Sequence, residues 1–231
     1  MSKNRLLFCL IFLSFIYSKK NYEELVYKAQ FRNITAGESI FKHYKNDNPA
    51  LYDKVVFELK TNKLLDFIYI IRDKIKLELN HVDYSLNKII KNSRQSRKIK
   101  HHHATVDYES GLINFKNGTL KITNKIYDPI SIIYFLRNQS LYIGREFVFN
   151  SYNNGKIKKV RIKITDEETI TSPIGSYPCY VITPSNDELL KEDEIMKLWI
   201  SKKPPYLPIK IEKNSKNGII KLLLKKINND E

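Results

Sequence analysis

Short runs of alternating hydrophobic and polar residues recur along the sequence, and three Asn-Gly pairs lie between such runs. Asn-Gly favours the two-residue type I′ turn of a β-hairpin, because both residues tolerate positive φ. The three pairs are Asn117-Gly118, Asn154-Gly155 and Asn217-Gly218. After the second pair the alternation places Val160, Ile162 and Ile164 on one face and Lys159, Arg161 and Lys163 on the other. One buried and one solvated face are typical of an antiparallel sheet.

Further strands are expected over residues 25–31, 39–44, 55–60, 74–82, 97–108, 195–201 and 209–227. The run Tyr177–Ile182 is also strand-like. The apolar run from Leu64 to Ile71 fits either a short helix or a buried strand, because so short a run does not decide between them.

One helix stands out. Asp128 is a favourable N-cap and Pro129 suits the first helical position. The residues from Pro129 to about Asn138 are apolar almost all round, which is typical of a buried helix. The predicted fold is therefore mainly β: a curved antiparallel sheet or open β-barrel built from hairpins, with one main buried helix near 129–138.

The N-terminus has the form of an export signal. Lys3 and Arg5 precede an apolar run from Leu6 to Tyr17. This run is shorter than the roughly 20 residues that a membrane-spanning helix needs, but it suits the apolar region of a signal peptide. We expect residues 1–18 to be a signal peptide cleaved near Ser18, and residues 19–231 to be a single β-rich exported domain in the periplasm. Ile16 is a poor residue for the cleavage site, so an uncleaved N-terminal membrane tether stays open as the alternative.

The composition is that of a folded protein, with 42% hydrophobic and 28% charged residues. The net charge is +15, but Lys supplies 32 of the 40 basic residues and they are spread along the chain. Nucleic-acid recognition favours clustered Arg, so we expect no nucleic-acid partner and count an anionic membrane surface among the candidate partners. Cys9 lies in the signal and leaves Cys179 alone, so no intrachain disulfide is expected.

Several short motifs occur in an ordered series. The helix segment Asp128-Pro129-Ile130-Ser131 continues to Tyr134 and Arg137 and resembles the D-P-[LI]-S-x-x-Y-x-x-R motif of an exported bacterial domain of unknown function, family 3108. The other segments resembling that family are Glu24-Leu25-Val26-Tyr27 with Ala36-Gly37 (its E-x-L-x-Y … A-G pattern), Ile71-Arg72-Asp73, Pro173-Ile174-Gly175-Ser176-Tyr177, and Leu198-Trp199-Ile200-Ser201 with Leu207-Pro208-Ile209.

The resemblance spans about Glu24 to Leu224 and implies an exported, mostly antiparallel β protein without an established activity. Lys202-Lys203 replaces an acidic pair that often follows the Trp motif, so any role of those acids would be missing here. We expect structural roles for the motif residues Asp128, Pro129, Ser131, Tyr134, Arg137, Trp199, Ser201 and Pro208.

Candidate chemistry is sparse. On a strand, His101 and His103 would share a face with Asp107, which gives at most a weak candidate for a Zn or Cu site. Asp128 and Arg137 could be read as a ligand-clamping pair, but helix capping and the helix dipole explain them more simply. Motifs of hydrolases, metalloproteases and phosphate-binding loops are missing from the sequence. We assign no catalytic residue and no cofactor.

The sequence therefore predicts a non-enzymatic binding or scaffold domain of the cell envelope. Its expected partner is a lipid or other apolar or amphiphilic ligand, or an envelope protein, held by a curved sheet with a concave side. The alternative is a metal-dependent hydrolase that uses the His101-His102-His103 cluster, and nucleic-acid binding is the third hypothesis.

Overall fold

The computed structural model describes residues 22–48, 50–185, 196–215 and 218–229. The predicted signal peptide and its cleavage site lie outside these residues. No helix in the described part of the chain is long and apolar enough to cross a membrane.

Strands dominate the structure, and the two helices are short. The elements are β1 (Tyr22–Phe31), β2 (Ile34–Tyr44), β3 (Asp53–Thr61), α1 (Lys63–Asp66), β4 (Ile71–Leu79), β5 (Leu86–Gln95), β6 (Lys98–Asp107), β7 (Leu112–Phe115), β8 (Gly118–Lys121), β9 (Ile126–Tyr127), α2 (Pro129–Arg137), β10 (Glu146–Asn153), β11 (Lys156–Ser172), β12 (Gly175–Pro184), β13 (Met196–Ser201), β14 (Pro208–Ser215) and β15 (Gly218–Asn229).

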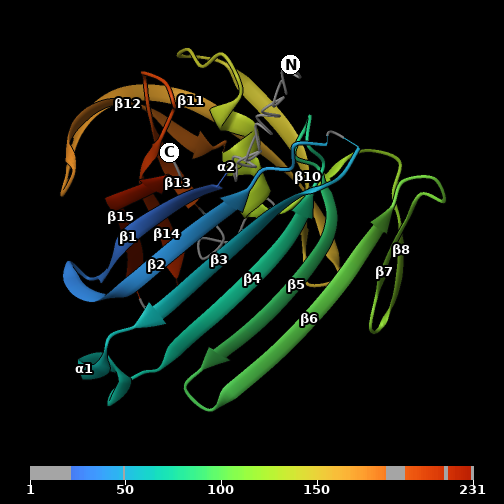
Figure 1. The fold of residues 1–231 in the computed structure, drawn as a ribbon, viewed down its shortest axis with the longest axis horizontal. Coiled ribbons are helices and arrows are strands. Elements are labelled where there is room, and N and C mark those ends of the chain that lie inside the picture. Colours follow the sequence, from blue (N-terminus) through green and yellow to red (C-terminus); the bar gives the residue numbers. More distant parts are fainter. Residues whose placement is uncertain (1–21, 49, 186–195, 216–217, 230–231) are drawn as a thin grey trace, which may run out of the picture.

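All the strands belong to one curved, open sheet, as the sequence predicts. Its order runs from β8 through β7, β6, β5, β4, β3, β2 and β1 to β15, and then through β14, β13, β12, β11 and β10 to β9. The pairings are antiparallel except that β9 lies parallel to β10. Because β1 pairs with β15, the first and last strands join the two halves of the sheet (Figure 1).

The expected hairpins form, with one difference in register. The turn at Asn154-Gly155 joins β10 to β11, and both residues have positive φ, of 48° and 80°. Between β7 and β8, Phe115 pairs with Gly118, so Lys116 and Asn117 form the turn and Gly118 already begins the strand. A two-residue turn one position earlier than expected therefore connects these strands. The third pair, at Asn217, lies partly outside the described residues, although β14 and β15 pair as predicted.

The sequence missed strand β5 and the two-residue strand β9, and it left one segment open. Strand β5 has a polar second half that does not alternate, and its pairing with both β4 and β6 stabilises it. The run from Leu64 to Ile71 is the short helix α1, a connecting segment and the first residue of β4, and none of the α1 residues is buried. Of the two alternatives, a short helix or a buried strand, the structure shows a short helix, and it is exposed.

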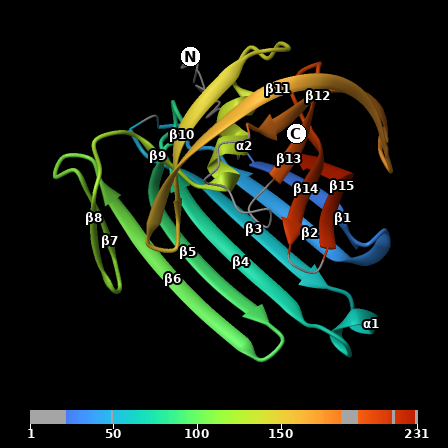
Figure 2. The ribbon, with the colours of Figure 1, turned by 180° about the vertical axis from the view of Figure 1, so that it is seen from behind.

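Helix α2 lies between the two halves of the sheet (Figures 1 and 2). Ile133 and Leu136 are buried, and they belong to one hydrophobic cluster that draws side chains from both halves. The helix and these side chains pack into the concave side of the sheet, so α2 is the buried helix that the sequence predicts near 129–138.

Candidate functional site

The N-terminus of α2 is fixed by hydrogen bonds that its own sequence supplies. The Asp128 Oδ1 atom accepts from the backbone N–H of Ile130 at 2.9 Å, and the Ser131 hydroxyl accepts from the backbone N–H of Asp128 at 2.9 Å. With Pro129 in the first turn, this forms a capping box. The Lys91 ammonium lies 2.9 Å from Oδ2 of the buried Asp128 and balances its charge. The helix therefore holds its position against the sheet from its first residue.

At the other end of α2, Arg137 forms a bidentate ion pair with Glu23 of β1. Its two terminal nitrogens each donate to one carboxylate oxygen at 2.6 Å, and Nε donates to the carbonyl of Tyr206 at 3.1 Å. Burial alone raises the pKa of Glu23, but the hydrogen bonds and charge of Arg137 outweigh it and hold that pKa below its usual range. Burial opposes the charge of Arg137, yet Glu23 more than offsets this and raises its pKa. Both groups are charged, and the pair ties the helix end to β1.

A second buried carboxylate lies close by. Asp53 at the start of β3 accepts hydrogen bonds at 2.9 Å from the His43 Nε2 atom, the His81 Nδ1 atom and the backbone N–H of Asn46. Burial raises the pKa of Asp53, but these three hydrogen bonds hold it below its usual range. The two imidazoles contact separate carboxylate oxygens, and Asp53 therefore orients His43, whose ring lies 4.8 Å from that of Tyr134.

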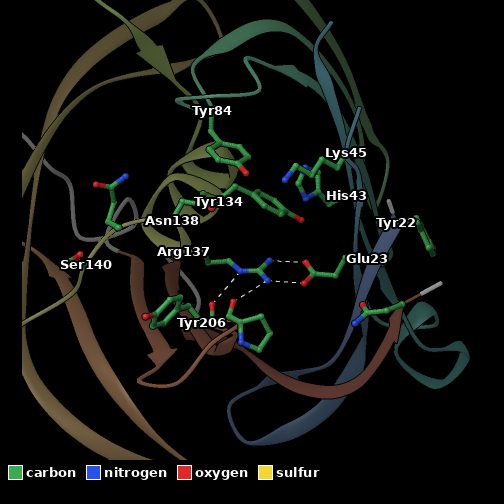
Figure 3. Close-up of a pocket in the computed structure, with 13 residues that line it drawn as sticks. Tyr22, Glu23, His43, Lys45, Tyr84, Tyr134, Arg137, Asn138, Ser140 and Tyr206 are labelled. Atoms are coloured by element: carbon green, nitrogen blue, oxygen red, sulfur yellow. Dashed lines mark hydrogen bonds and ion pairs between the residues drawn. The ribbon is translucent and has the colours of Figure 1, made fainter. Parts of the chain in front are cut away.

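Between these groups is a cavity of about 630 Å³ (Figure 3). Its walls are mostly polar and aromatic, and they come from β1, the end of β2 and the residue after it, the turn between β4 and β5, the end of α2 and the residues after it, the loop before β14 and the end of β15. They are Tyr22, Glu23, His43, Lys45, Tyr84, Tyr134, Arg137, Asn138, Gln139, Ser140, Pro205, Tyr206 and Asn229.

The Tyr134 hydroxyl distinguishes this cavity from an ordinary polar depression. The side chain is 3% exposed, and its oxygen has no hydrogen-bond partner among the described residues. Figure 3 shows the ring extending from α2 towards His43 and Glu23. Burial, followed by the Glu23 charge, raises the pKa of this phenol, so the hydroxyl keeps its proton. It is a hydrogen-bond donor at the cavity wall for which the described residues supply no acceptor.

The other motif residues lie in the hydrophobic core or fix loops. Trp199 is buried and donates from Nε1 to the Glu168 carboxylate at 2.9 Å. The Ser201 hydroxyl accepts from the backbone N–H of Leu207 at 2.7 Å and thereby shapes the loop that carries Tyr206. The carbonyl of Pro208 accepts from the buried Tyr27 hydroxyl at 2.7 Å. These contacts hold the loop of residues 203–207 in position, and Pro205 and Tyr206 of this loop form part of the cavity wall.

The histidine run lies elsewhere, on β6. His101 and His103 are exposed with Asp107, as the alternation predicts, while His102 faces inward and contacts the Tyr152 hydroxyl at 2.9 Å. His101 contacts the Asn92 side chain at 2.8 Å. Among the described residues, no group of three or more His, Cys, Asp or Glu side chains is arranged to hold a metal ion.

Three further reactive side chains, Arg72, Asp73 and Cys179, are not among the residues that line the cavity. Arg72 pairs with Asp66, while Asp73 binds Ser93 on the next strand, so this adjacent Arg and Asp do not contact the same group. Cys179 is fully buried, and burial raises the pKa of its thiol to about 11. A thiol of this kind is inert at neutral pH.

The sequence did not identify most of the cavity. Glu23, His43, Asp53, Tyr84 and Tyr206 come from four separate regions of the chain, and none of them forms a local motif with another. One signal was available. In the E-x-L-x-Y pattern the Glu stands two residues before Leu25, which is Glu23 rather than Glu24. The acidic residue of the first motif and the Arg of the helix motif are therefore the two members of the ion pair.

The comparisons with known proteins agree with this architecture. The model of one family, described as "Protein of unknown function (DUF3108)", matches residues 26–225. No curated protein matches the sequence. Among solved structures, the chain is similar to a beta-barrel-like protein of the domain of unknown function DUF1849 from Brucella abortus, with 8% identity and a TM-score of 0.63. That similarity covers 92% of this chain and 99% of the other, and at such low identity it concerns the fold alone.

Proposed function

Because the chain belongs to the family Protein of unknown function (DUF3108), whose description gives no activity, we propose a function from the geometry of the cavity. The protein is an exported, non-enzymatic binding domain of the cell envelope, and its cavity binds a small polar or amphiphilic molecule that carries an acceptor oxygen. Export rests on the N-terminal sequence, and binding rests on the cavity.

The Tyr134 hydroxyl carries the proposal. A buried hydroxyl without a partner costs about 1–3 kcal/mol, so proteins usually supply such a group with a partner, and at a cavity wall an acceptor atom of a ligand can be that partner. Arg137 and Glu23 are already paired, and His43 is oriented by Asp53. A ligand oxygen placed at Tyr134 would therefore meet a preorganised surface, which lowers the cost of binding.

The lining also narrows the class of ligand. Lys45 adds an exposed ammonium group at the wall, Asn138 and Gln139 offer amides, and the Tyr rings provide flat apolar surface. A carboxylate, phosphate or hydroxyl group fits such a wall. The apolar side chains of α2 pack against one another in the hydrophobic core, so the cavity wall is left mainly with polar and aromatic groups. Such a wall favours a ligand with a polar head over a wholly apolar one.

Catalysis receives less support. Asp53 and His43 resemble two members of a catalytic triad, but among the described residues no Ser, Thr or Cys hydroxyl or thiol is hydrogen-bonded to His43. The alternative of a metal-dependent hydrolase at His101-His102-His103 has no metal-binding geometry behind it in the described part of the chain.

Native mass spectrometry of the full chain, recovered from the envelope fraction of cells that express it, tests the proposal. The parent should carry an adduct of reproducible mass, and the variant Tyr134→Phe should lose most of it. Tyr152→Phe is the matched control, because it removes a buried phenol hydroxyl that contacts His102 outside the cavity. A parent without any adduct, or an adduct retained equally by Tyr134→Phe, would contradict the proposal.

A second experiment, on the periplasmic, membrane and cytosolic fractions of the same cells, tests location. N-terminal sequencing of the protein in each fraction should find a start near Lys19 in the periplasm, or an intact Met1 in the membrane fraction if the tether is retained. An intact Met1 in the cytosol would contradict export while leaving the binding result to be judged separately.

A further inference from the structure

One end of the sheet has a composition that the cavity does not explain. Three neighbouring turns meet there: residues 31–35 between β1 and β2, residues 60–72 between β3 and β4, and residues 94–98 between β5 and β6. Together these residues are called the α1 end, and Figure 1 shows them along the lower left edge of the molecule. The opposite end of the same strands is formed by residues 44–48, 50–54, 79–86 and 107–112, and Lys45 and Tyr84 place it beside the cavity.

The α1 end exposes large apolar side chains at its tips. Phe67 is 90% exposed, Ile68 79% and Leu64 77%, and Ile34 of β2 and Ile99 of β6 are also exposed. Neighbouring strands lie about 5 Å apart, so side chains from β2 to β6 fall within a strip about 20 Å wide. Exposed apolar side chains gathered in this way mark an interaction surface.

These tips are held outward by polar contacts at their base. The backbone N–H of Asn62 donates to the Ala36 carbonyl at 2.9 Å, and that of Ser96 donates to the Ile70 carbonyl at 2.7 Å. The Asn62 side chain caps α1 by accepting from the backbone N–H of Leu65 at 2.9 Å. The turns are thus tied to one another, and the apolar side chains are presented together without folding back onto the sheet.

The charge of this end identifies the surface that it fits. Its three segments contain seven Lys and Arg residues and a single carboxylate, Asp66, which is paired with Arg72. The segments of the opposite end contain five carboxylates and two Lys residues. Val82, at that acidic end, is 81% exposed, so exposure of apolar side chains alone does not separate the two ends. The two ends differ in the sign of their charge, which is positive at the α1 end and negative at the opposite end.

We propose that the α1 end docks on the surface of an anionic phospholipid bilayer. Phe67, Ile68 and Leu64 enter the interface between head groups and acyl chains, and the basic residues around them contact the lipid phosphates. Apolar burial and electrostatic attraction together produce such binding, and each Lys or Arg near an anionic surface adds to it. The proposal stands on different residues from the cavity and does not depend on the ligand bound there.

Co-sedimentation of the purified full chain with vesicles tests it. The vesicles contain equal parts of phosphatidylglycerol and phosphatidylcholine, and vesicles of phosphatidylcholine alone are the comparison. Partition coefficients come from a lipid titration, so that a contribution of residues 1–21, common to every variant, cancels in the ratios. The parent should prefer the anionic vesicles, and high salt should weaken that preference.

Two variants separate the apolar tips from apolar exposure in general. The double variant Phe67→Ser and Ile68→Ser should reduce partitioning about tenfold or more, because it removes two large apolar side chains from the interface. Val82→Ser should leave partitioning unchanged, since Val82 is as exposed as Ile68 but lies among carboxylates. All of these positions are exposed, and thermal melting should show that each variant folds.

Equal partitioning of parent and double variant would overturn the proposal, as would equal binding to both kinds of vesicle. Self-association in sedimentation velocity that the double variant abolishes, together with no vesicle binding, would assign the α1 end to a second copy of this chain and would overturn it too.

Discussion

Two arginine–carboxylate pairs, at opposite ends of the same strands, show how differently one interaction can serve a fold. Arg137 and Glu23 are largely buried, and their 2.6 Å bidentate contact joins α2 to β1 beside the cavity. Arg72 and Asp66 are also in contact, but the Arg72 side chain is 42% exposed and the pair lies in the connection between β3 and β4. Because the Arg137–Glu23 pair is largely removed from water, loss of one partner would leave a buried charge without a counter-charge. In the Arg72–Asp66 pair, water can replace a lost partner.

The comparison extends to the apolar residues around each pair. At the cavity end, α2 presents Ile133 and Leu136 to the core and leaves polar groups around an open space. At the α1 end, polar groups form hydrogen bonds at the base of the turn, and Phe67 is exposed to solvent. Polar groups line the cavity proposed to bind a ligand at one end, and apolar groups form the surface proposed to dock on a bilayer at the other.

The largest expected difference comes from placing a charge at an apolar residue within α2 and at the apolar residue that directly follows α1. Leu136→Asp buries a carboxylate without a partner and should lower the free energy of unfolding by about 3 kcal/mol or more. Phe67→Asp places the same charge in solvent and should leave the free energy of unfolding nearly unchanged. Chemical denaturation of both variants measures this difference, and a Leu136→Asp protein as stable as its parent would show that α2 is peripheral.

Removing the carboxylates of the two ion pairs should give a smaller contrast. Glu23→Gln leaves Arg137 buried without its counter-charge and should cost about 3 kcal/mol, the lower part of the range for a broken buried pair. Asp66→Asn should shift the melting temperature far less, because Arg72 returns to water. Melting curves of the two variants at one pH make the comparison, which would fail if both shifts were alike.

The pH dependence of stability sharpens the same contrast. The pKa of Glu23 is lowered in the folded protein, so its contribution is fully present above the ordinary Glu pKa of about 4.3 and is lost as the pH falls through the lower folded value. Asp53 contributes with the same sign. Unfolding free energies measured from about pH 6 down to pH 3 should therefore fall less steeply for Glu23→Gln than for the parent. A parallel decline would mean that the pair does not carry this dependence.

The sequence predicts local elements of this fold well, because local contacts determine them. The capping residues and apolar surface of α2 depend on neighbours in the chain, as does the Asn154-Gly155 turn. Strand β5 was missed because it is held by β4 and β6 on either side and its own second half is polar. The outward position of Phe67 was also beyond prediction, because an apolar run does not reveal whether its side chains are covered.

The cavity was harder to predict than the fold. Arg137 and Glu23 are 114 residues apart, and Tyr206 is 69 residues beyond Arg137, so only the pairing of β1 with β15 and the packing of α2 bring them together. The motif residues pointed to Tyr134 and Arg137 but suggested only helix capping and packing for that segment. A shared role in one cavity required the three-dimensional arrangement.

The difference between the two ends is tested most directly by finding which of them meets a bilayer. In a chain with Cys9→Ser, an environment-sensitive fluorophore is attached at Leu64→Cys or at Val82→Cys, positions of similar exposure, while the buried Cys179 stays unlabelled. On addition of phosphatidylglycerol vesicles, the account predicts a blue shift of the emission for the label at position 64 and none at position 82. A shift at position 82 alone, or equal shifts at both, would contradict it.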